Sequence, residues 1–266
     1  MTTPKHDIAV LFTVFKPRDE IKATLASLMA QSVPFTLYLV DDGTPYDVDY
    51  ETLTAGMHVV INRLPRNVGR TPALNVGLRS ILAAGHSYVA LMDNADTCDP
   101  MRLEKQRDFL VGTPDIAIVS TWTRYHYQVT GRTMEAKLPA DWQLCKKLLR
   151  YNAPITHTAM MVRADVYRAV DLYSEAYPAA EDYAFEHMAN ALGFKMCNIP
   201  EFLMDTLEMT ESISGGKRRE QLNSRLSLQW RFADWLNIHT YLGLVRTLAL
   251  MVLPVGLLRS LKSLRK

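Results

Sequence analysis

Two carboxylates follow an apolar run directly and lie three positions apart. The run is Val89–Met92, and the acids are Asp93 and Asp96. Such a run, ending in turn residues, is typical of a buried strand in a parallel sheet, whose ligands bind beyond the carboxyl ends of the strands. Two acids there can hold a divalent cation, and the cation can hold a diphosphate. The alternative is a capped strand end leading into a helix at Pro100.

Two further acidic pairs occur where strands or helices are expected to end or begin, Asp41-Asp42 and Glu181-Asp182. An acid after the second strand can accept a hydrogen bond from a nucleotide base, and an acid that opens a helix can deprotonate an acceptor hydroxyl. Three acidic clusters at one sheet edge therefore predict a nucleotide-plus-metal site for sugar transfer. The alternative for Glu181 and Asp182 is the ordinary acidic first turn of a helix.

The elements that position these acids alternate along the first half of the chain. Strands that alternate with helices imply right-handed crossovers and a mostly parallel α/β sheet. Helices are predicted after Pro17 and across Leu74–Leu82. The predicted strands are Ile8–Val14, Phe35–Val40, His58–Ile61, Tyr88–Met92 and Ile116–Thr121.

The second half of the chain has a less regular pattern. One of its predicted helices, Glu181–Leu192, opens with acids and stops at Gly193. A strand is predicted at Thr158–Val162. The other predicted helices are Asp141–Tyr151, Arg163–Val170 and Glu220–Asn237.

The C-terminal part of the chain is apolar and basic. Tyr241–Leu258 is almost wholly apolar but contains Arg246 and Pro254, so it favours an interfacial helix over a membrane span. The alternative is a helix packed on the domain. Residues 216–266 carry ten Lys/Arg against two Asp/Glu, whereas the rest of the chain carries a net charge of −6. A basic tail on an acidic body predicts an anionic membrane surface as its partner, and we expect no nucleic-acid partner.

Two features indicate a cytoplasmic location. The cysteines are three in number and widely spaced, which fits a reducing compartment, and the N-terminus lacks the apolar core of a signal peptide. With the basic tail, they predict a protein peripheral to the inner face of the cell membrane.

Several short motifs have a specific order and spacing. They are Phe12–Lys16, Val40–Thr44, Asn67–Leu78, Asp93–Asp96 with Pro100–Gln106, Ala180–Phe185, Asn198–Leu203 and Ser212–Ser214. Together they resemble family 2 glycosyltransferases of the GT-A fold, of the bacterial exopolysaccharide and O-antigen type, over residues 8–215. The resemblance implies an inverting transfer, in which an acceptor hydroxyl attacks the anomeric carbon of a nucleotide sugar while the diphosphate leaves.

The same resemblance implies roles for individual residues. The general base would be Asp182, with Glu181 as second choice. Either Asp41 or Asp42 would bind the nucleotide base, Asp93 the ribose and metal, and Asp96 the metal. Further nucleotide contacts fall on Thr13, Phe15, Asn67 and Arg70.

Acceptor contacts are expected at His157 and Trp122. The alternatives are a structural histidine, held by hydrogen bonds, and a tryptophan that packs in the core.

Two departures from the family pattern weaken the expected Mn²⁺ or Mg²⁺ site. Ala95 replaces an acid, and Met209 stands where the family often has a histidine, which removes two metal ligands. The segment Gly215–Arg219 follows, and we predict that Arg218 or Arg219 contacts the diphosphate. The alternative is a solvated basic linker.

These observations predict a GT-A domain at residues 1–215 and a basic helical tail at 216–266. The expected function is transfer from a nucleotide diphosphate sugar to a lipid-linked glycan in bacterial surface polysaccharide assembly, either exopolysaccharide or lipopolysaccharide. A competing hypothesis is a degraded homologue that acts as a nucleotide-binding or membrane scaffold. A nucleotidyltransferase would need a glycine-rich loop where Phe15-Lys16-Pro17 stands.

Overall fold

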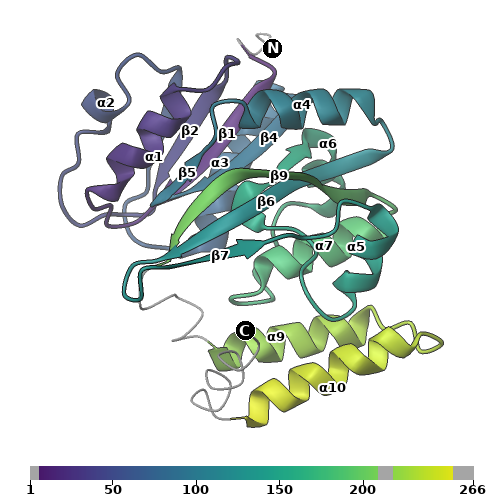
Figure 1. Cartoon of the computed structure of the whole chain (residues 1–266). Helices are drawn as coiled ribbons and strands as arrows, with labels where there is room; N and C mark the ends of the chain where they lie inside the picture. The colour runs from purple at the N-terminus through teal and green to yellow at the C-terminus, as the bar shows by residue number, and fades with distance from the viewer. Residues whose placement is uncertain (1–5, 209–217, 254–266) are drawn as a thin grey trace.

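Four parallel strands form the first half of a nine-stranded sheet (Figure 1). The structure is a computed structural model, which describes residues 6–208 and 218–253. The strands lie in the order β3-β2-β1-β4, so a crossover returns the chain to the other side of β1. Their bounds are β1 Ile8–Val14, β2 Thr36–Asp41, β3 Val59–Arg63 and β4 Tyr88–Asp93.

The second half of the sheet is mixed. It continues from β4 as β8-β6-β9-β5, with β7 paired to the outer part of β6. Strands β6 and β9 run parallel, while β8 and β5 run antiparallel to their neighbours. The bounds are β5 Asp96–Cys98, β6 Ile116–Tyr127, β7 Arg132–Ala136, β8 Met161–Arg163 and β9 Lys195–Glu208. The strand predicted at Thr158–Val162 is thus shorter, because the 3₁₀ turn η1 (His157–Ala159) precedes it.

Helices cover both faces of the sheet. Along β1, Ala9 and Leu11 join the core under α3, while Val10 and Phe12 join the core under α1 and α4, so successive side chains are buried on opposite faces. The helices of the domain are α1 Glu20–Met29, α2 Tyr50–Leu53, α3 Arg70–Ala84, α4 Arg102–Gly112, α5 Trp142–Leu149, α6 Ala164–Val170 and α7 Glu181–Ala191.

Two antiparallel helices, α9 (Arg218–Arg231) and α10 (Ile238–Val252), lie beneath the domain (Figure 1). The helix predicted to run to Asn237 ends at Arg231, because Asn237 instead caps α10 by accepting a hydrogen bond from the His239 backbone N–H. Leu228 anchors α9 in a small core against α7. Within residues 6–208 and 218–253, every helix is too short or too polar to span a bilayer.

Candidate active site

The acidic clusters lie at the carboxyl ends of the central strands. Strands β2 and β4 end at Asp41 and Asp93, and Thr13 of β1 lies between them in register with Asp93 and with Val40. The ends of parallel strands meet at one edge of a sheet, which is where ligands of α/β proteins bind. The structure therefore brings these three predicted residues together.

The predicted base-binding residues Asp41 and Asp42 are both buried and have different tasks. Both carboxylate oxygens of Asp42 are occupied by the loop before α3. They accept hydrogen bonds from the backbone N–H groups of Val68 (2.7 Å) and Gly69 (3.0 Å) and from the side-chain amide of Asn67 (2.8 Å). Asp42 and Asn67 therefore shape the loop. Asp41 is engaged at one oxygen, since Oδ1 accepts from the Thr44 backbone N–H at 2.9 Å, so it is the candidate for contact with a nucleotide base through its other oxygen.

The turn after β2 packs closely against that loop. Gly43 has a φ of 71°, and a Cβ there would come within 2.1 Å of the Arg66 carbonyl carbon, so only glycine fits. Across the edge, the Lys16 N–H donates to the Thr44 hydroxyl, which ties the turn after β1 to the turn after β2. Phe15 in that turn is 43% exposed, so its ring is open to stack on a base.

Arg70, the first residue of α3, connects three elements of the site. Its Nη1 and Nη2 donate to the two oxygens of Asp93, at 2.7 and 3.2 Å. Its Nε lies 3.3 Å from Oε1 of Glu181, and Nη2 donates to Nδ1 of His157 at 3.1 Å. Burial acts to lower the pKa of Arg70, but the neighbouring carboxylates, Asp93 first, hold it above its usual value. The guanidinium is thus a fixed cation at the strand end.

His157 is held in one tautomer by its two neighbours. A guanidinium can only donate, so Nδ1 accepts from Arg70, and Nε2 carries the proton and donates to the Tyr173 hydroxyl at 2.8 Å. Burial, and then the charge of Arg70, holds the pKa of His157 well below its ordinary value. His157 is therefore a neutral support for Arg70 in this structure, which agrees with the structural alternative.

The two acids that open α7 differ in their surroundings. Glu181 is buried and paired with Arg70, and burial followed by the charge of Asp182 raises its pKa. Asp182 is partly exposed, and its Oδ1 accepts a hydrogen bond from the Tyr183 backbone N–H. Among the residues that the structure describes, Asp182 makes no ion pair. Its carboxylate is therefore the one left available to take a proton.

The turn between Asp93 and Asp96 directs these two acids differently. Ala95 has a φ of 74°, an uncommon conformation for a residue with a Cβ, and it returns the chain into the sheet as β5. Asp96 is consequently only 3% exposed, with Oδ2 unpartnered. Burial, and then the charge of Asp93, raises its pKa to about 8, so Asp96 is largely protonated at neutral pH.

The described residues do not fit a preformed cation site. Both oxygens of Asp93 are engaged by Arg70, Asp96 is only 3% exposed, and residues 6–208 and 218–253 contain no group of three His, Cys, Asp or Glu side chains placed to hold a metal. Met209 lies outside the described residues. We therefore derive no catalytic step through a metal.

Other predicted contacts have structural tasks or lie elsewhere. The Trp122 indole N–H donates to the Leu138 carbonyl (3.0 Å) and its ring packs on Phe202, as the packing alternative expected. The Arg218 guanidinium donates to the carbonyls of Leu250 and Leu253 at the end of α10, and Arg219 is exposed. The segment 209–217, which holds the predicted domain boundary, is outside the described residues.

Two buried residues behind the site were not singled out from the sequence. Tyr173 supports His157, and fully buried Arg102 donates to the carbonyls of Leu91 in β4 and Thr158 in η1. Arg102 lies in the motif that follows Asp96. The sequence feature that points to Arg102 is its spacing from Gln106. Positions four apart lie on one face of a helix, and there the two side chains form a hydrogen bond.

A comparison with protein families assigns the chain that carries this site. The family model described as "Glycosyl transferase family 2" matches residues 9–170, which include β1 to β4, the loop of Asn67 and the turn of Ala95. The chain belongs to glycosyl transferase family 2. The matched range covers more than half of the chain.

Individual relatives agree with this assignment. The amylovoran biosynthesis glycosyltransferase AmsE of Erwinia amylovora is 26% identical over 170 residues, or 64% of this chain, which spans only 62% of that relative's length. The structure of S. aureus TarS 1-349 in complex with UDP-GlcNAc superposes with a TM-score of 0.71 at 16% identity, covering 92% of this chain and 72% of that one. The mannosyltransferase PcManGT from Pyrobaculum calidifontis, in complex with GDP-Man and Mn²⁺, gives 0.63 at 13% identity over 98% and 81%. These likenesses confirm the GT-A fold.

Proposed function

We propose that this chain transfers a sugar from a nucleotide diphosphate sugar to an acceptor hydroxyl, with inversion at the anomeric carbon. One observation carries the proposal. Arg70 binds Asp93 at the donor edge and Glu181 at the start of α7, and the adjacent Asp182 makes no ion pair with any residue that the structure describes. The arrangement gives a donor site and an unpaired carboxylate within the reach of one arginine.

Asp182 acts as the general base in this proposal. It takes the proton of the acceptor hydroxyl as that oxygen bonds to the anomeric carbon, while the bond from this carbon to the diphosphate oxygen breaks on the opposite face. The diphosphate leaves with the bonding electron pair. Glu181 stays the second choice as the base, because its ion pair with Arg70 and its burial restrict its access to an acceptor.

The donor is bound by the edge of the sheet. Asp41 accepts from the nucleotide base, the exposed ring of Phe15 stacks on it, and Asp93 binds the ribose. Arg70 supplies positive charge beside the diphosphate, and Arg219, which is exposed, is a further candidate, whereas Arg218 is engaged at the end of α10. Mn²⁺ or Mg²⁺ is proposed only as a companion of the diphosphate, which brings its own oxygen ligands.

The acceptor proposed for this site is a lipid-linked saccharide at the cytoplasmic face of the membrane. Two observations support it. AmsE, a relative, is named for amylovoran biosynthesis, and the C-terminal part of the chain is apolar and basic. The role proposed for the reaction is therefore the assembly of a bacterial surface polysaccharide.

A non-catalytic scaffold is the second candidate. It is favoured by Arg70, which occupies both oxygens of Asp93, and by the buried Asp96. A scaffold could retain nucleotide binding, but it would have no turnover that depends on Asp182.

A thermal-shift screen of UDP- and GDP-sugars, each with and without Mn²⁺, tests the donor site. A ligand that binds the folded state stabilises it by RT ln(1 + [L]/Kd). We expect one nucleotide sugar to raise Tm, and Mn²⁺ to add to this rise while having no effect alone, because the protein ligands are incomplete. A rise with Mn²⁺ alone would show a preformed metal site, and no rise with any nucleotide sugar would contradict the donor site.

A further inference from the structure

Helix α10 has its polar and apolar faces reversed relative to a helix of a water-soluble protein. The side that packs on the domain carries the buried residues Thr240, Gly243 and Thr247. The opposite side exposes large apolar side chains, among them Leu242 (53%) and Val245 (64%). A surface helix normally buries its apolar stripe, so the exposed side of α10 lacks the partner that its composition requires.

Specific contacts dock α10 on the rest of the structure. Its polar side is therefore buried because the helix packs there. Thr247 donates a hydrogen bond to the Gln229 side chain of α9 at 2.7 Å, and Arg246 donates to the Tyr151 carbonyl at 2.6 Å. A Cβ on Gly243 would lie 2.2 Å from the Arg150 carbonyl oxygen, so the helix backbone touches the domain there. These contacts fix which side of α10 points outward.

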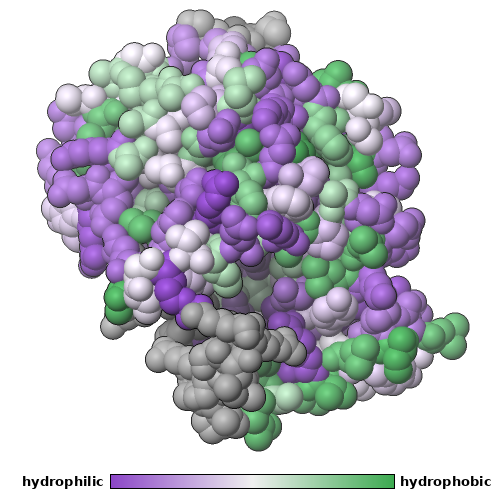
Figure 2. Space-filling model, in the orientation of Figure 1, coloured by the Kyte–Doolittle hydropathy of each residue, from purple (hydrophilic) through white to green (hydrophobic). Residues whose placement is uncertain are grey.

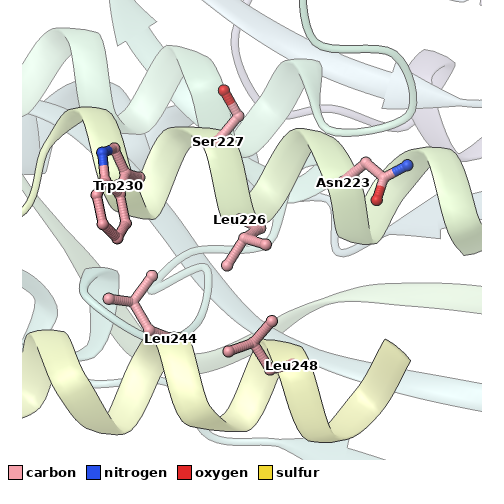
Figure 3. A pocket seen from close by; sticks show the side chains of 6 residues that line it. All are labelled: Asn223, Leu226, Ser227, Trp230, Leu244 and Leu248. Carbon is pink, nitrogen blue, oxygen red and sulfur yellow. The ribbon is translucent and has the colours of Figure 1, made fainter. Parts of the chain in front are cut away.

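The outward side of α10 joins an apolar loop and an open apolar seam. Leu236 at the tip of the α9–α10 loop is fully exposed, and Trp230 and Trp235 beside it are 65% and 44% exposed. Between the helices, a groove of about 490 Å³ has Leu226 and Trp230 of α9 on one side and Leu244 and Leu248 of α10 on the other (Figure 3). Figure 2 shows hydrophobic residues along this edge of the molecule, over α10 and the loop.

We propose that this surface, formed by the outward side of α10 and the α9–α10 loop, inserts into the interfacial layer of an anionic lipid bilayer. Three observations favour lipid as the occupant. Trp235 contacts both Trp230 and Tyr241 at its edge, and such aromatic side chains are typical of the membrane interface. The 15 residues of α10 extend about 22 Å, too short to span the hydrocarbon layer.

The third observation is the charge of the chain that follows. Arg246 is the only Lys, Arg, Asp or Glu in α10, and it is engaged with the domain. The 13 residues after Leu253 then carry Arg259, Lys262, Arg265 and Lys266 and no acid. An apolar surface continued by a basic segment matches the acyl layer and the negatively charged head groups of one membrane.

The same surface orients the proposed active site. The Ser224 hydroxyl of α9 donates to the Pro178 carbonyl, and Arg231 donates to the Tyr177 hydroxyl, in the segment that leads into α7. The start of α7, with Asp182, therefore adjoins the helix pair whose outer side would lie on the lipid. This orientation rests on the proposed function, since an acceptor with a lipid anchor would approach Asp182 from the membrane.

Co-sedimentation of the full chain with lipid vesicles tests the insertion without a substrate. The vesicles are phosphatidylcholine alone, or phosphatidylcholine with about one third phosphatidylglycerol. The variants are Leu242→Glu and Val245→Glu, both at exposed positions on the outward side of α10. The matched control is Val129→Glu, which is 68% exposed in the turn between β6 and β7.

We expect wild type and Val129→Glu to bind the anionic vesicles equally, with a blue shift of Trp fluorescence. Each variant on α10 should bind at least about tenfold more weakly, because a carboxylate is repelled by the head groups and excluded from the acyl layer. Binding to neutral vesicles should be weaker than to anionic ones, and salt should weaken the anionic binding.

Three outcomes would overturn the proposal. The first is that wild type does not bind anionic vesicles, and the second is that Val245→Glu binds them as well as wild type does. The third is that wild type binds no vesicles and forms a dimer, which Val245→Glu converts to a monomer. That result would make a second copy of the chain the occupant of the surface. The nucleotide-sugar thermal shift is measured separately in detergent-free buffer. A thermal shift without vesicle binding would show that the membrane surface is wrong. Vesicle binding without a thermal shift would show that the proposed reaction is wrong.

Discussion

Arg70 sets the charge of the site at the scale of single residues. Its guanidinium is shared by Asp93, Glu181 and His157, which come from β4, α7 and η1. The charge-assisted bidentate pair with Asp93 is directional and fixes that acid in place before a substrate binds, while Glu181 is held by a single contact at 3.3 Å. Asp182 makes no ion pair among the described residues, and the proposed reaction uses this difference in surroundings to give two adjacent acids different roles.

Asp96 should make the free energy of unfolding depend on pH, and the substitution Asp96→Asn should remove this dependence. Burial raises its pKa from the ordinary value of 3.8 to about 8, so the folded state binds the proton more tightly than the unfolded chain. The stabilising contribution is full below about pH 4 and is lost as pH rises toward about pH 8. Wild type should therefore lose up to about 1.4 kcal/mol per pH unit relative to Asp96→Asn within this window.

Urea denaturation of both proteins between about pH 5 and pH 8 measures this difference. Buried histidines such as His157 have a lowered pKa, which makes the free energy of unfolding rise with pH in both proteins. Subtracting the value of Asp96→Asn from that of wild type at each pH cancels this opposite effect. Parallel pH profiles for the two proteins would show that Asp96 is ionised in the folded state.

The candidate site was predictable from the sequence in part. Acids at the ends of β2 and β4 and at the start of α7 follow from local patterns, and these positions are correct. The burial of Asp96 was not predictable, because it depends on the positive φ of Ala95 and on pairing with β9. The ion pairs of Arg70 join residues 23 and 111 positions apart, and no local pattern contains such contacts.

At the scale of elements, strands β1 to β4 and helices α5 to α7 were predicted to within two residues, because hydrophobic periodicity reports burial directly. Strand β6 instead continues to Tyr127, past its predicted end at Thr121. The exposed hairpin strand β7 and the three-residue β5 were missed. The residues of β7 are mostly exposed, and β5 is too short to show a period. The break between α9 and α10 was predicted after Asn237 but comes after Arg231, since Asp234 and Asn237 form a turn that the apolar pattern conceals.

Gly243→Ala tests how α10 docks on the domain. The added Cβ would meet the Arg150 carbonyl oxygen at 2.2 Å, and neither backbone can yield without moving the helix. We expect a loss of about 1–3 kcal/mol in the free energy of unfolding.

The matched control is Gly112→Ala at the end of α4, where a Cβ would meet nothing within 4 Å, so stability should stay the same or rise slightly. Equal effects of the two substitutions in urea denaturation would mean that the contact of α10 with Arg150 does not form in solution.

At the scale of the whole molecule, charge and hydropathy are divided between two parts. The chain up to residue 215 is acidic and carries the edge of the sheet with the candidate site, while residues 216–266 carry a net charge of +8 and the reversed helix α10. The overall α/β architecture followed from the sequence, but the reversal of α10 did not. Its apolar residues look the same in the sequence whether they face the domain or away from it.

The account depends most on Asp182 as the base of a sugar transfer. Once the screen has identified a donor, turnover of Asp182→Asn should be compared with that of wild type and of Glu181→Gln, with a soluble acceptor. Asp182→Asn keeps the shape of the side chain but cannot take the proton, so we predict a fall of about 10²–10⁴-fold in kcat with unchanged donor binding. Glu181→Gln, which loses only the pairing with Arg70, should fall much less. Full activity of Asp182→Asn, or a larger loss in Glu181→Gln, would contradict the account.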